Sequence, residues 1–495
     1  MQFTGFLQGD QPSYTAFVRA TYLRGNGIVF ASPFDSDARA PRVLINLTYS
    51  ALGVLNRLTG DRPVIAWEIW RAVFGIGTYG LFALIAVQLL TGRARVAAVA
   101  FGMFGGGIGW IYALGFYFSG RQPSWFMALN DAEYSYGWWC LNLFRQAIYP
   151  LELFYHTLVF AAIYAYLRRG LAVATMVVAL SWWCHMITAA LLTSIIGGAM
   201  LLEWRLKKEE RRELSVHIAV IGVTSLVAVW YNAIFLHQFP AINSWIKATL
   251  SLESPMYLAD YPRAYGPLLI APLLMFWTPM RRWILDKREG RLLAVWIAAV
   301  LCWSHQDAFG AQGVQPIHFV RGHLYAALVL LAGKALELAL VNCPAPRRWL
   351  AAGAFLFLVA AADNAFFVAR VALSPPEPGI LSFDADSMQV INYYRDRHEP
   401  TIIQCQDRGV GVMILARTSH SVFSSEPFLT PFYNDKMHLL PYLNRAGRIP
   451  AFKSIGVQEL IIHRNLMPGL LPWHSDPALV DTLLANDTYV VIRLR

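Results

Sequence analysis

The residues VIAWEIWRAVFGIGTYGLFALIAVQLLTGRARVAAVAFGMFGGGIGWIYALGFYF, numbered 64–118, hold the pattern that recurs through this chain. Two apolar runs are separated by the short basic loop TGRARV at 91–96. Each run is long enough to cross the roughly 30 Å hydrocarbon core of a bilayer as a helix. Because such runs recur along most of the 495 residues, the sequence predicts a polytopic α-helical membrane protein.

The composition agrees with this prediction. Hydrophobic residues make up 56% of the chain and charged residues only 15%, whereas soluble domains carry about 25% charged residues. The formal charge of +10 does not indicate nucleic-acid binding, because the basic residues lie between the hydrophobic runs and not on one exposed face. The five cysteines are scattered singly, so neither a disulfide framework nor a zinc site is indicated.

Ten crossings are expected. The run 171–203 is too long for one crossing and is interrupted at SWWCHM, so we interpret it as two shorter helices that meet at His185. The remaining eight crossings are expected near 64–90, 97–118, 150–167, 215–237, 264–280, 291–304, 323–343 and 350–372.

The positions of Lys and Arg predict the orientation, because short cytoplasmic loops are enriched in these residues. Three alternate loops, 119–149, 238–263 and 305–322, carry five Lys or Arg in total. Sixteen lie in the shorter intervening loops, TGRARV, RRG, WRLKKEERREL, MRRWILDKREGR and CPAPRRW. Both terminal regions are therefore expected outside the cytoplasm. Since Met1 would then start outside with no helix before it, we also expect an eleventh crossing upstream and a cytoplasmic N-terminus.

The chain is expected to have three regions. Residues 1–62 form an outer loop with two membrane-surface helices, at 12–25 and 43–58, and residues 63–373 form the transmembrane bundle. Residues 374–495, which begin with the proline-rich SPPEPG, form a C-terminal extracytoplasmic α/β domain. Its expected helix is DADSMQVINYYRD and its expected strands are TIIQC, HSVFS, VQELIIH and TYVVIRL.

Asp10, in GFLQGDQPSY, is the first candidate for chemistry. A carboxylate at the membrane surface can act as a general base toward an acceptor hydroxyl. It also stands directly before a helix, where Asp commonly serves as the N-cap, and one residue can do both. Asp35 and Asp37, in FDSDARAP, are interpreted as solvated turn residues.

Ionisable residues close to the spans form a second group of candidates. Glu152 and His156 lie one helical turn apart at the outer end of a crossing, where burial favours a functional role but the interface weakens that inference. His185 could donate to a phosphate, orient a carboxylate or serve as a hinge. Arg321, flanked by His318 and His323, suits a lipid phosphate that its guanidinium can bind bidentately, or simple interfacial anchoring.

Two further motifs have structural alternatives. Asp131 and Glu133 share an outer loop with aromatic residues that could stack on sugar rings or form an interfacial belt. The glycine cluster FGMFGGGIGW, 101–110, lies within a span and lacks Lys, so we interpret its overlapping GxxxG pairs as tight helix packing and not as a nucleotide loop.

Taken together, GDQPSYTAFVRA, ASPFDSDARAP, GGGIGW, the break at His185 and the late outer Arg321 resemble the GT-C superfamily of polytopic glycosyltransferases that use lipid-linked sugars. The resemblance is to uncharacterised bacterial members and covers most of the chain. It implies inverting transfer of a hexosyl or pentosyl group from a polyprenyl-phosphate donor, at the outer face of the bacterial inner membrane. The implied acceptor is a lipid-linked glycan, a lipid or a protein.

The resemblance also implies roles for particular residues. Asp10 matches the acidic general base of the first outer loop, and Arg321, together with His185, matches the basic residues that hold the donor phosphate. Members often have paired acids in that loop, whereas Gln11 follows Asp10 here. No cofactor is therefore expected, and a divalent metal is possible but not indicated. Two alternatives stay open: a multi-span transporter or flippase, and a non-catalytic envelope assembly protein.

Overall fold

The computed structural model describes residues 1–23, 25–37, 39–132, 142–250, 256–310, 315–341, 346–374, 377–466 and 469–495. The chain forms two compact units. Unit 1 comprises residues 1–67, 229–252 and 375–495, and unit 2 comprises residues 68–228 and 253–374. Unit 1 therefore combines N-terminal and C-terminal segments that the sequence analysis assigns to separate domains.

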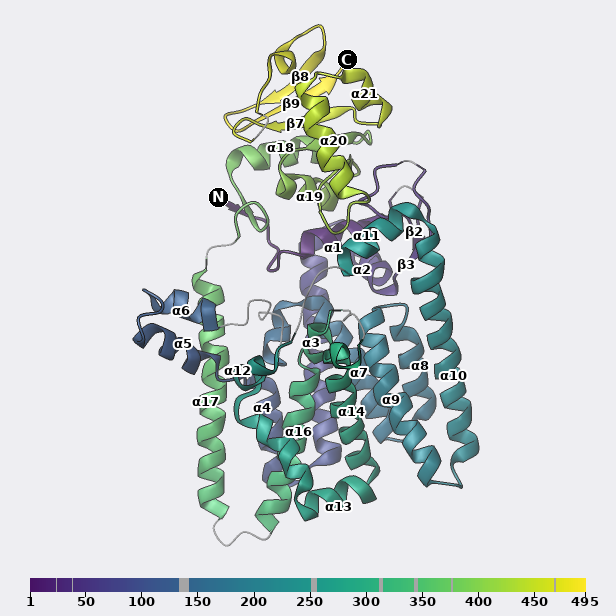
Figure 1. Cartoon of the computed structure of the whole chain (residues 1–495), viewed down its shortest axis with the longest axis vertical. Coiled ribbons are helices and arrows are strands. Elements are labelled where there is room, and N and C mark those ends of the chain that lie inside the picture. The colour runs from purple at the N-terminus through teal and green to yellow at the C-terminus, as the bar shows by residue number, and fades with distance from the viewer. Residues whose placement is uncertain are drawn as a thin grey trace. The chain divides into compact units, whose positions relative to one another are not determined.

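Unit 2 is helical in the part of the chain that the structure describes (Figure 1). Its α-helices, including α3, which starts in unit 1, are α3 (Pro63–Leu89), α4 (Gly92–Phe104), α5 (Gly109–Phe118), α6 (Trp125–Ala132), α7 (Pro150–Leu167), α8 (Leu171–Ser181), α9 (Met186–Leu206), α10 (Arg211–Trp230), α12 (Tyr261–Tyr265), α13 (Thr278–Asp286), α14 (Arg288–Ser304), α15 (Ile317–Val320), α16 (His323–Val341) and α17 (Pro346–Leu373). Its 3₁₀ helices are η1 (Phe144–Ile148), η4 (Leu258–Asp260), η5 (Gly266–Phe276) and η6 (Gln306–Phe309).

The length and hydropathy of these helices identify a multi-pass membrane protein. Six helices of the described residues are long and apolar enough to cross a bilayer: Pro63–Leu89, Pro150–Leu167, Met186–Leu206, Arg211–Gln238, Ile317–Leu340 and Ala351–Leu373. Two bent pairs raise the number to eight: Gly92–Phe104 with Gly109–Phe118, bent by 54°, and Leu258–Phe276 with Thr278–Asp286, bent by 77°.

The expected number of ten crossings stays a prediction. It requires two further helices that are shorter, α8 with 11 residues and α14 with 17. The predicted break inside 171–203 is confirmed, because α8 ends at Ser181 and α9 begins at Met186. His185 is the N-cap of α9, and its side chain accepts a hydrogen bond from the Thr188 amide.

The glycine-rich segment packs closely, as predicted, but it does not form a continuous helix. A Cβ at Gly102 would overlap the Phe82 ring. After Phe104 the chain leaves the helix and begins a new one at Gly109. Gly107 approaches the backbone of Arg263 so closely that a Cβ would overlap its carbonyl oxygen. Close packing and a bend therefore occur at the same glycines, and the bend opens the backbone amides between the two helices to other partners.

Unit 1 contains a five-stranded mixed sheet with the order β6-β5-β7-β9-β8. Strands β6, β5 and β7 are parallel, and β9 pairs antiparallel with both β7 and β8. In the register, Cys405 pairs with Ile461 and Ile461 with Val491. The strands of this sheet are β5 (Ile402–Cys405), β6 (Ser421–Val422), β7 (Glu459–His463), β8 (Val480–Ala485) and β9 (Tyr489–Leu494).

The other elements of unit 1 surround this sheet or precede it in the chain (Figure 1). Two short antiparallel pairs join distant segments: β1 pairs with β4, and β2 pairs with β3. The remaining elements are β1 (Gln2–Phe3), α1 (Gln11–Ala20), β2 (Val29–Phe30), β3 (Leu44–Ile45), α2 (Leu47–Leu58), η2 (Tyr231–Phe235), η3 (Leu236–Gln238), α11 (Pro240–Leu250), β4 (Ser382–Phe383), α18 (Ala385–Arg395), α19 (Arg408–Arg417), α20 (Tyr433–Arg445), α21 (Ile449–Ser454) and η7 (Pro472–Ser475).

The four expected strand segments and the helix DADSMQVINYYRD all form, as β5, β6, β7, β9 and α18. The hairpin partner β8 was not expected. The core of this part of unit 1 lies between the sheet and the helices α20 and α21. It consists of buried apolar side chains, including Leu440, Leu443, Phe452, Ile462, Val490 and Ile492. Burying such side chains contributes about 1.5–3 kcal/mol each.

The prediction that residues 12–25 form a membrane-surface helix is wrong in its environment. The helix α1 exists, but nine of its ten residues are buried, including Ser13 and Arg19, and it packs against α19. A tertiary partner far along the chain therefore covers the face that the sequence assigns to solvent. The helix α2 keeps exposed apolar residues, Val54 and Leu58, as a surface helix should.

Candidate active site

Asp10 stands at the N-cap position of α1 but does not cap it. Its backbone is helical, with φ −80° and ψ −16°, and its side chain makes no capping hydrogen bond. The carboxylate oxygen Oδ2 instead accepts a hydrogen bond from Gln8 Nε2 at 2.7 Å. The side chain is half-buried. The capping interpretation is therefore wrong for the side chain.

Gln11, which takes the place of a second acid, organises the loop before α1. Its side-chain Oε1 accepts hydrogen bonds from the amides of Leu7 and Gln8, at 2.8 and 3.0 Å, and it is 1% exposed. An amide oxygen in this place fixes the backbone on either side of Asp10. The Gln therefore positions the loop without adding charge beside the carboxylate.

A second acid does reach Asp10, but from far along the chain. Burial raises the pKa of Glu426, the Arg408 guanidinium lowers it, and Asp10 raises it again. Arg408 donates to both carboxylate oxygens of Glu426, at 2.6 to 3.0 Å. Burial, together with the charge of Asp10, also raises the pKa of Tyr49. The charge of Asp10 thus favours the protonated form of both Glu426 and Tyr49.

The two acids of FDSDARAP differ from each other. Asp37 is exposed and accepts a hydrogen bond from the Arg39 amide at 2.8 Å, as expected for a solvated turn. Asp35 is also a turn residue, because its Oδ1 accepts a hydrogen bond from the Asp37 amide at 3.1 Å, but its side chain is half-buried and not fully solvated. Burial raises its pKa, and the ammonium of Lys436 on α20 lowers it. Burial in turn lowers the pKa of Lys436 to about 8. The charges of Asp35 and Lys436 therefore act on each other.

Unit 2 brings together five of the predicted residues. Arg321 Nη1 forms an ion pair with Glu152 Oε1 on α7, and Arg321 Nη2 lies 2.7 Å from His318 Nε2. The residues Arg321 and Glu152 are 4% and 8% exposed. Since a guanidinium has only donors, His318 Nε2 must accept here, which places the ring proton on Nδ1. The arrangement is a buried, oriented cation with an imidazole N–H beside it.

His156 links the two elements that carry this ion pair. Its Nδ1 lies 2.8 Å from the Glu152 carbonyl oxygen, and its Nε2 lies 2.7 Å from the Arg321 carbonyl oxygen. The ring stacks on His323 with centroids 4.0 Å apart. The bend after Arg321 needs glycine, because Gly322 has φ +65° and a Cβ there would lie 2.9 Å from His156 Nε2. His156 therefore fixes the backbone that carries Arg321.

His185 joins this cluster from the break between α8 and α9. Its ring stacks on Tyr155 with centroids 4.2 Å apart, and it lies 6.4 Å from the ring of His318. Its Nδ1 lies 2.8 Å from Thr188 Oγ1. The hinge alternative predicted satisfaction by backbone carbonyls, but Nδ1 of the side chain bonds to the hydroxyl and amide of Thr188.

The remaining predicted residues lie elsewhere. Asp131 is exposed on α6, where Gln122 donates to its carboxylate and Arg121 Nε lies 4.0 Å away. It belongs to unit 2 but not to the Arg321 cluster. Glu133 lies outside the described residues. No group of three or more His, Cys, Asp or Glu in the described ranges could hold a metal ion.

A second buried polar network in unit 2 was missed. Arg145 Nη2 donates to Asp363 Oδ2 on α17 at 2.8 Å, and the Gly107 amide donates to the same oxygen at 2.9 Å. Asn364 Nδ2 donates to the carbonyl oxygens of Phe104 and Gly105. The carboxylate thus binds the amides that the bend before α5 exposes. An acid within an apolar span, as in AADNAF, is the sequence signal that would have found it.

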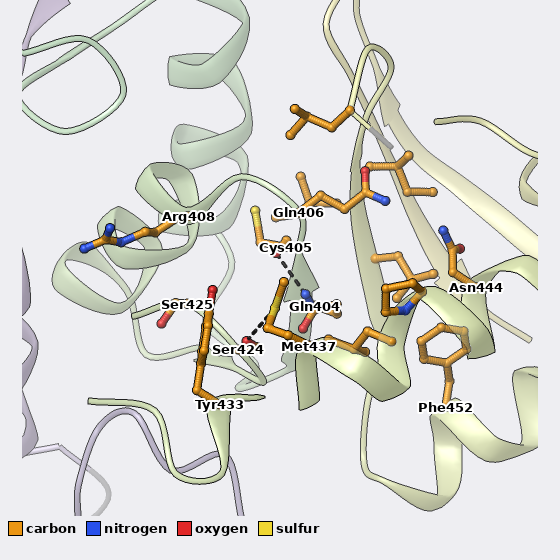
Figure 2. A pocket seen from close by; sticks show the side chains of 16 residues that line it. Gln404, Cys405, Gln406, Arg408, Ser424, Ser425, Tyr433, Met437, Asn444 and Phe452 are labelled. Atoms are coloured by element: carbon orange, nitrogen blue, oxygen red, sulfur yellow. Dashed lines mark hydrogen bonds between the residues drawn. The ribbon is translucent and has the colours of Figure 1, made fainter. Parts of the chain in front are cut away.

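Unit 1 also contains a cavity of about 290 Å³ at the carboxyl ends of β5 and β7 (Figure 2). The parallel strands have the order β6-β5-β7, so the chain reverses direction across the sheet between β5 and β7, where α/β domains usually bind ligands. Gln404 Oε1 and Ser425 Oγ line the cavity and are buried without a hydrogen-bond partner in the described structure. The cavity could hold a small neutral polar group. Asp10 is not part of its lining.

No protein-family profile and no curated protein sequence matches this chain. Solved structures do match. The arabinofuranosyltransferase AftD from Mycobacteria has a TM-score of 0.51 and 14% identity over 90% of this chain and 35% of AftD. The oligosaccharyltransferase AglB from Archaeoglobus fulgidus, solved with an inhibitory peptide and a dolichol-phosphate, has a TM-score of 0.45 and 12% identity over 92% of this chain and 66% of AglB.

The chain therefore spans about two thirds of AglB and about one third of AftD. At this level of identity the likeness to AftD defines the fold, which is that of the GT-C membrane glycosyltransferases. The resemblance stated from GDQPSYTAFVRA and GGGIGW is confirmed at the level of the fold.

Proposed function

We propose that the chain is a membrane glycosyltransferase that transfers a sugar from a polyprenyl-phosphate donor to an acceptor hydroxyl on the extracytoplasmic side of the bacterial inner membrane. The observation that carries this proposal is the GT-C fold together with a carboxylate, Asp10, that stands at the start of α1 without capping it. AftD is an arabinofuranosyltransferase, and AglB was solved with a dolichol-phosphate. The likeness to AftD supports glycosyl transfer in general, and the lipid-linked donor is proposed from the sequence resemblance to enzymes that use lipid-linked sugars.

The proposed reaction is a single displacement. Asp10 accepts the proton of the acceptor hydroxyl while the oxygen of that hydroxyl attacks the anomeric carbon of the donor sugar. The bond from that carbon to the phosphate oxygen breaks, so the configuration inverts and polyprenyl phosphate leaves with the electron pair. Because lipid phosphate is already a good leaving group, the enzyme needs chiefly a base, a cation and correct positioning.

The Arg321 cluster is the proposed donor-phosphate site. Glu152 and His156 hold the guanidinium and its backbone, and His318 and His185 offer imidazole nitrogens beside it. Charge-assisted hydrogen bonds from such groups to phosphate are short and about twice as strong as neutral ones. In this proposal Arg321, His318 and His185 bind the phosphate, whereas Glu152 and His156 position Arg321.

The test compares the wild type with Asp10→Asn and with Asp37→Asn as a matched control, each purified in detergent as the full chain. Polyprenyl-phosphate release from a panel of polyprenyl-phosphate sugars is measured in the presence of cell-envelope acceptors. Asp10→Asn should reduce turnover by about 10²–10⁴-fold, since Asn keeps the hydrogen bond to Gln8 but cannot accept the proton. Equal turnover in the wild type and Asp10→Asn would refute the assignment of the base.

Measurements of KM and kcat distinguish the phosphate-binding role proposed for His318 from the role of Asp10 as the base. His318→Gln should raise the KM for the donor more than it lowers kcat, because it removes a contact that the phosphate makes before and during transfer. A lower kcat with an unchanged KM would argue instead that His318 only positions Arg321.

A transporter is the second candidate, because two spans are broken, at 54° and 77°, and transporters use broken helices at their binding sites. A wild type that releases no polyprenyl phosphate from any donor, yet moves lipid-linked substrates across proteoliposomes, would favour this alternative over the glycosyltransferase.

A further inference from the structure

Unit 1 contains a strongly basic cavity that the proposed reaction does not use. Its volume is about 230 Å³, and apart from Pro63 and Val64 it is lined by charged residues only. Four of these are arginines from separate segments of the chain, and one is an acid: Arg19, Arg62, Arg395, Arg417 and Asp61. Folding therefore gathers four guanidinium groups around one small space.

The single acid of the lining is already engaged. Asp61 forms an ion pair with Arg19, and its Oδ1 accepts hydrogen bonds from Tyr22 Oη at 2.6 Å and Asn56 Nδ2 at 2.9 Å. Its charge therefore compensates one arginine. Asp396, outside the lining, has Oδ1 3.3 Å from Arg395 Nε, and that pair is exposed to solvent. The lining keeps an excess of positive charge.

Two features indicate that this excess of positive charge is unfavourable for the lining arginines. Arg19 is 6% exposed, and its Nε is buried without a hydrogen-bond partner in the described structure. Burial lowers the pKa of Arg417, and the charge of Arg395 lowers it further. Arg417 otherwise donates to the Thr4 carbonyl oxygen at 2.8 Å. An anion in the cavity would relieve both the repulsion and the missing hydrogen bond.

The location restricts which anions can reach the cavity. Pro63 and Val64 line it and form the first turn of α3, a candidate membrane span. The end of a span lies at the level of the lipid headgroups. The guanidinium group of arginine binds two oxygens of a phosphate at once. At the level of the headgroups, lipid phosphate would be the anion present at high local concentration.

We propose that Arg19, Arg62, Arg395 and Arg417 form a binding site for a phosphate group, taken from an anionic lipid headgroup or from free phosphate. The site shares no residue with the proposed base Asp10 or with the Arg321 cluster, and it does not depend on the glycosyltransferase activity. Bound phosphate would tie α1, the start of α3, α18 and α19 together through one anion.

The first experiment measures binding to the detergent-purified wild-type chain. Inorganic phosphate is titrated by calorimetry, and phosphatidylglycerol is compared with diacylglycerol, which lacks the phosphate, by native mass spectrometry. We expect phosphatidylglycerol to be retained and diacylglycerol to be lost. Binding of inorganic phosphate that displaces phosphatidylglycerol shows that the phosphate group suffices. Binding of phosphatidylglycerol alone assigns the site to lipid headgroups. No binding of either ligand overturns the proposal.

The second experiment locates the site with the double variant Arg62→Gln/Arg395→Gln. Both side chains are exposed, so the variant keeps the Arg19–Asp61 pair and the Arg417 hydrogen bond that the fold uses. Arg445→Gln, an exposed arginine outside the cavity, is the control. The double variant should bind at least about tenfold more weakly, given the strength of charge-assisted hydrogen bonds, while the control binds like the wild type. Equal binding by the double variant overturns the assignment.

Discussion

The buried ion pairs of unit 2 and the carboxylate of Asp10 in unit 1 differ in how they are engaged. In unit 2, Arg321 with Glu152 and Arg145 with Asp363 are buried and bonded to each other, so each group is part of the fold. In unit 1, Asp10 is half-buried and caps nothing. The difference shows where function can be separated from stability by mutation. Substitutions near Asp10 report chemistry, whereas substitutions in the Arg321 cluster also report the fold.

The largest expected effect on stability comes from breaking the buried ion pair between Arg321 and Glu152 in unit 2. Arg321→Met leaves the Glu152 carboxylate buried without its partner, which should cost about 3–5 kcal/mol in the free energy of unfolding. Thermal unfolding followed by tryptophan fluorescence measures this loss. The control Arg169→Gln removes an exposed pair with Glu210 and should cost no more than about 1 kcal/mol.

The double variant Arg321→Met/Glu152→Leu sharpens the same point. Removing both charges should recover much of the stability, because no unpaired charge is left in the interior. A double variant as unstable as Arg321→Met alone would show that packing, and not charge, determines the loss.

The next effect concerns the bend that exposes backbone amides to Asp363. Gly107→Ala places a Cβ on the Arg263 carbonyl oxygen, so it should destabilise the chain by about 1–3 kcal/mol through overpacking. Gly115→Ala is the control, because a Cβ at Gly115 meets nothing within 4 Å. Equal unfolding temperatures for the two variants would contradict the close approach of the backbones.

The pH dependence tests the burial of Lys436 on α20. Burial lowers the pKa of Lys436 to about 8, below its usual value of about 10.4 in the unfolded chain. Between these values the unfolded state binds more protons, so stability should rise with pH, by at most about 1.4 kcal/mol per pH unit. The unfolding temperature measured from pH 7.5 to 10 should rise less steeply in Lys436→Met.

Two helix N-termini in unit 1 give the smallest effects. Asp384 caps α18 by accepting from the Ser387 amide at 2.7 Å, so Asp384→Ala should cost about 1 kcal/mol. Asp10→Ala should change stability by no more than about 0.5 kcal/mol, because it removes no cap. Urea titration compares the two. A larger loss at Asp10 would indicate that its carboxylate supports the fold after all.

Local patterns predicted most of the elements. The apolar runs, the break at His185 and four strands of the C-terminal sheet follow from periodicity and turn residues, which act over a few positions. The strand β8 was missed because VDTLLA has no clear alternation, and its place depends on pairing with β9. The site was predicted less completely. Glu152, His156, His185, His318 and Arg321 were candidates one by one, but no local signal predicted their grouping.

The sequence alone settles that this chain spans a membrane several times, because hydropathy depends on composition over about 20 residues. It also identifies Asp10 as a candidate base. It does not show that Glu426 reaches Asp10, that α19 covers α1, or that Arg19, Arg395 and Arg417 meet in one cavity. Asp10, Arg19 and α1 are hundreds of positions from Arg395, α19 and Glu426, and such contacts arise only when distant segments pack together.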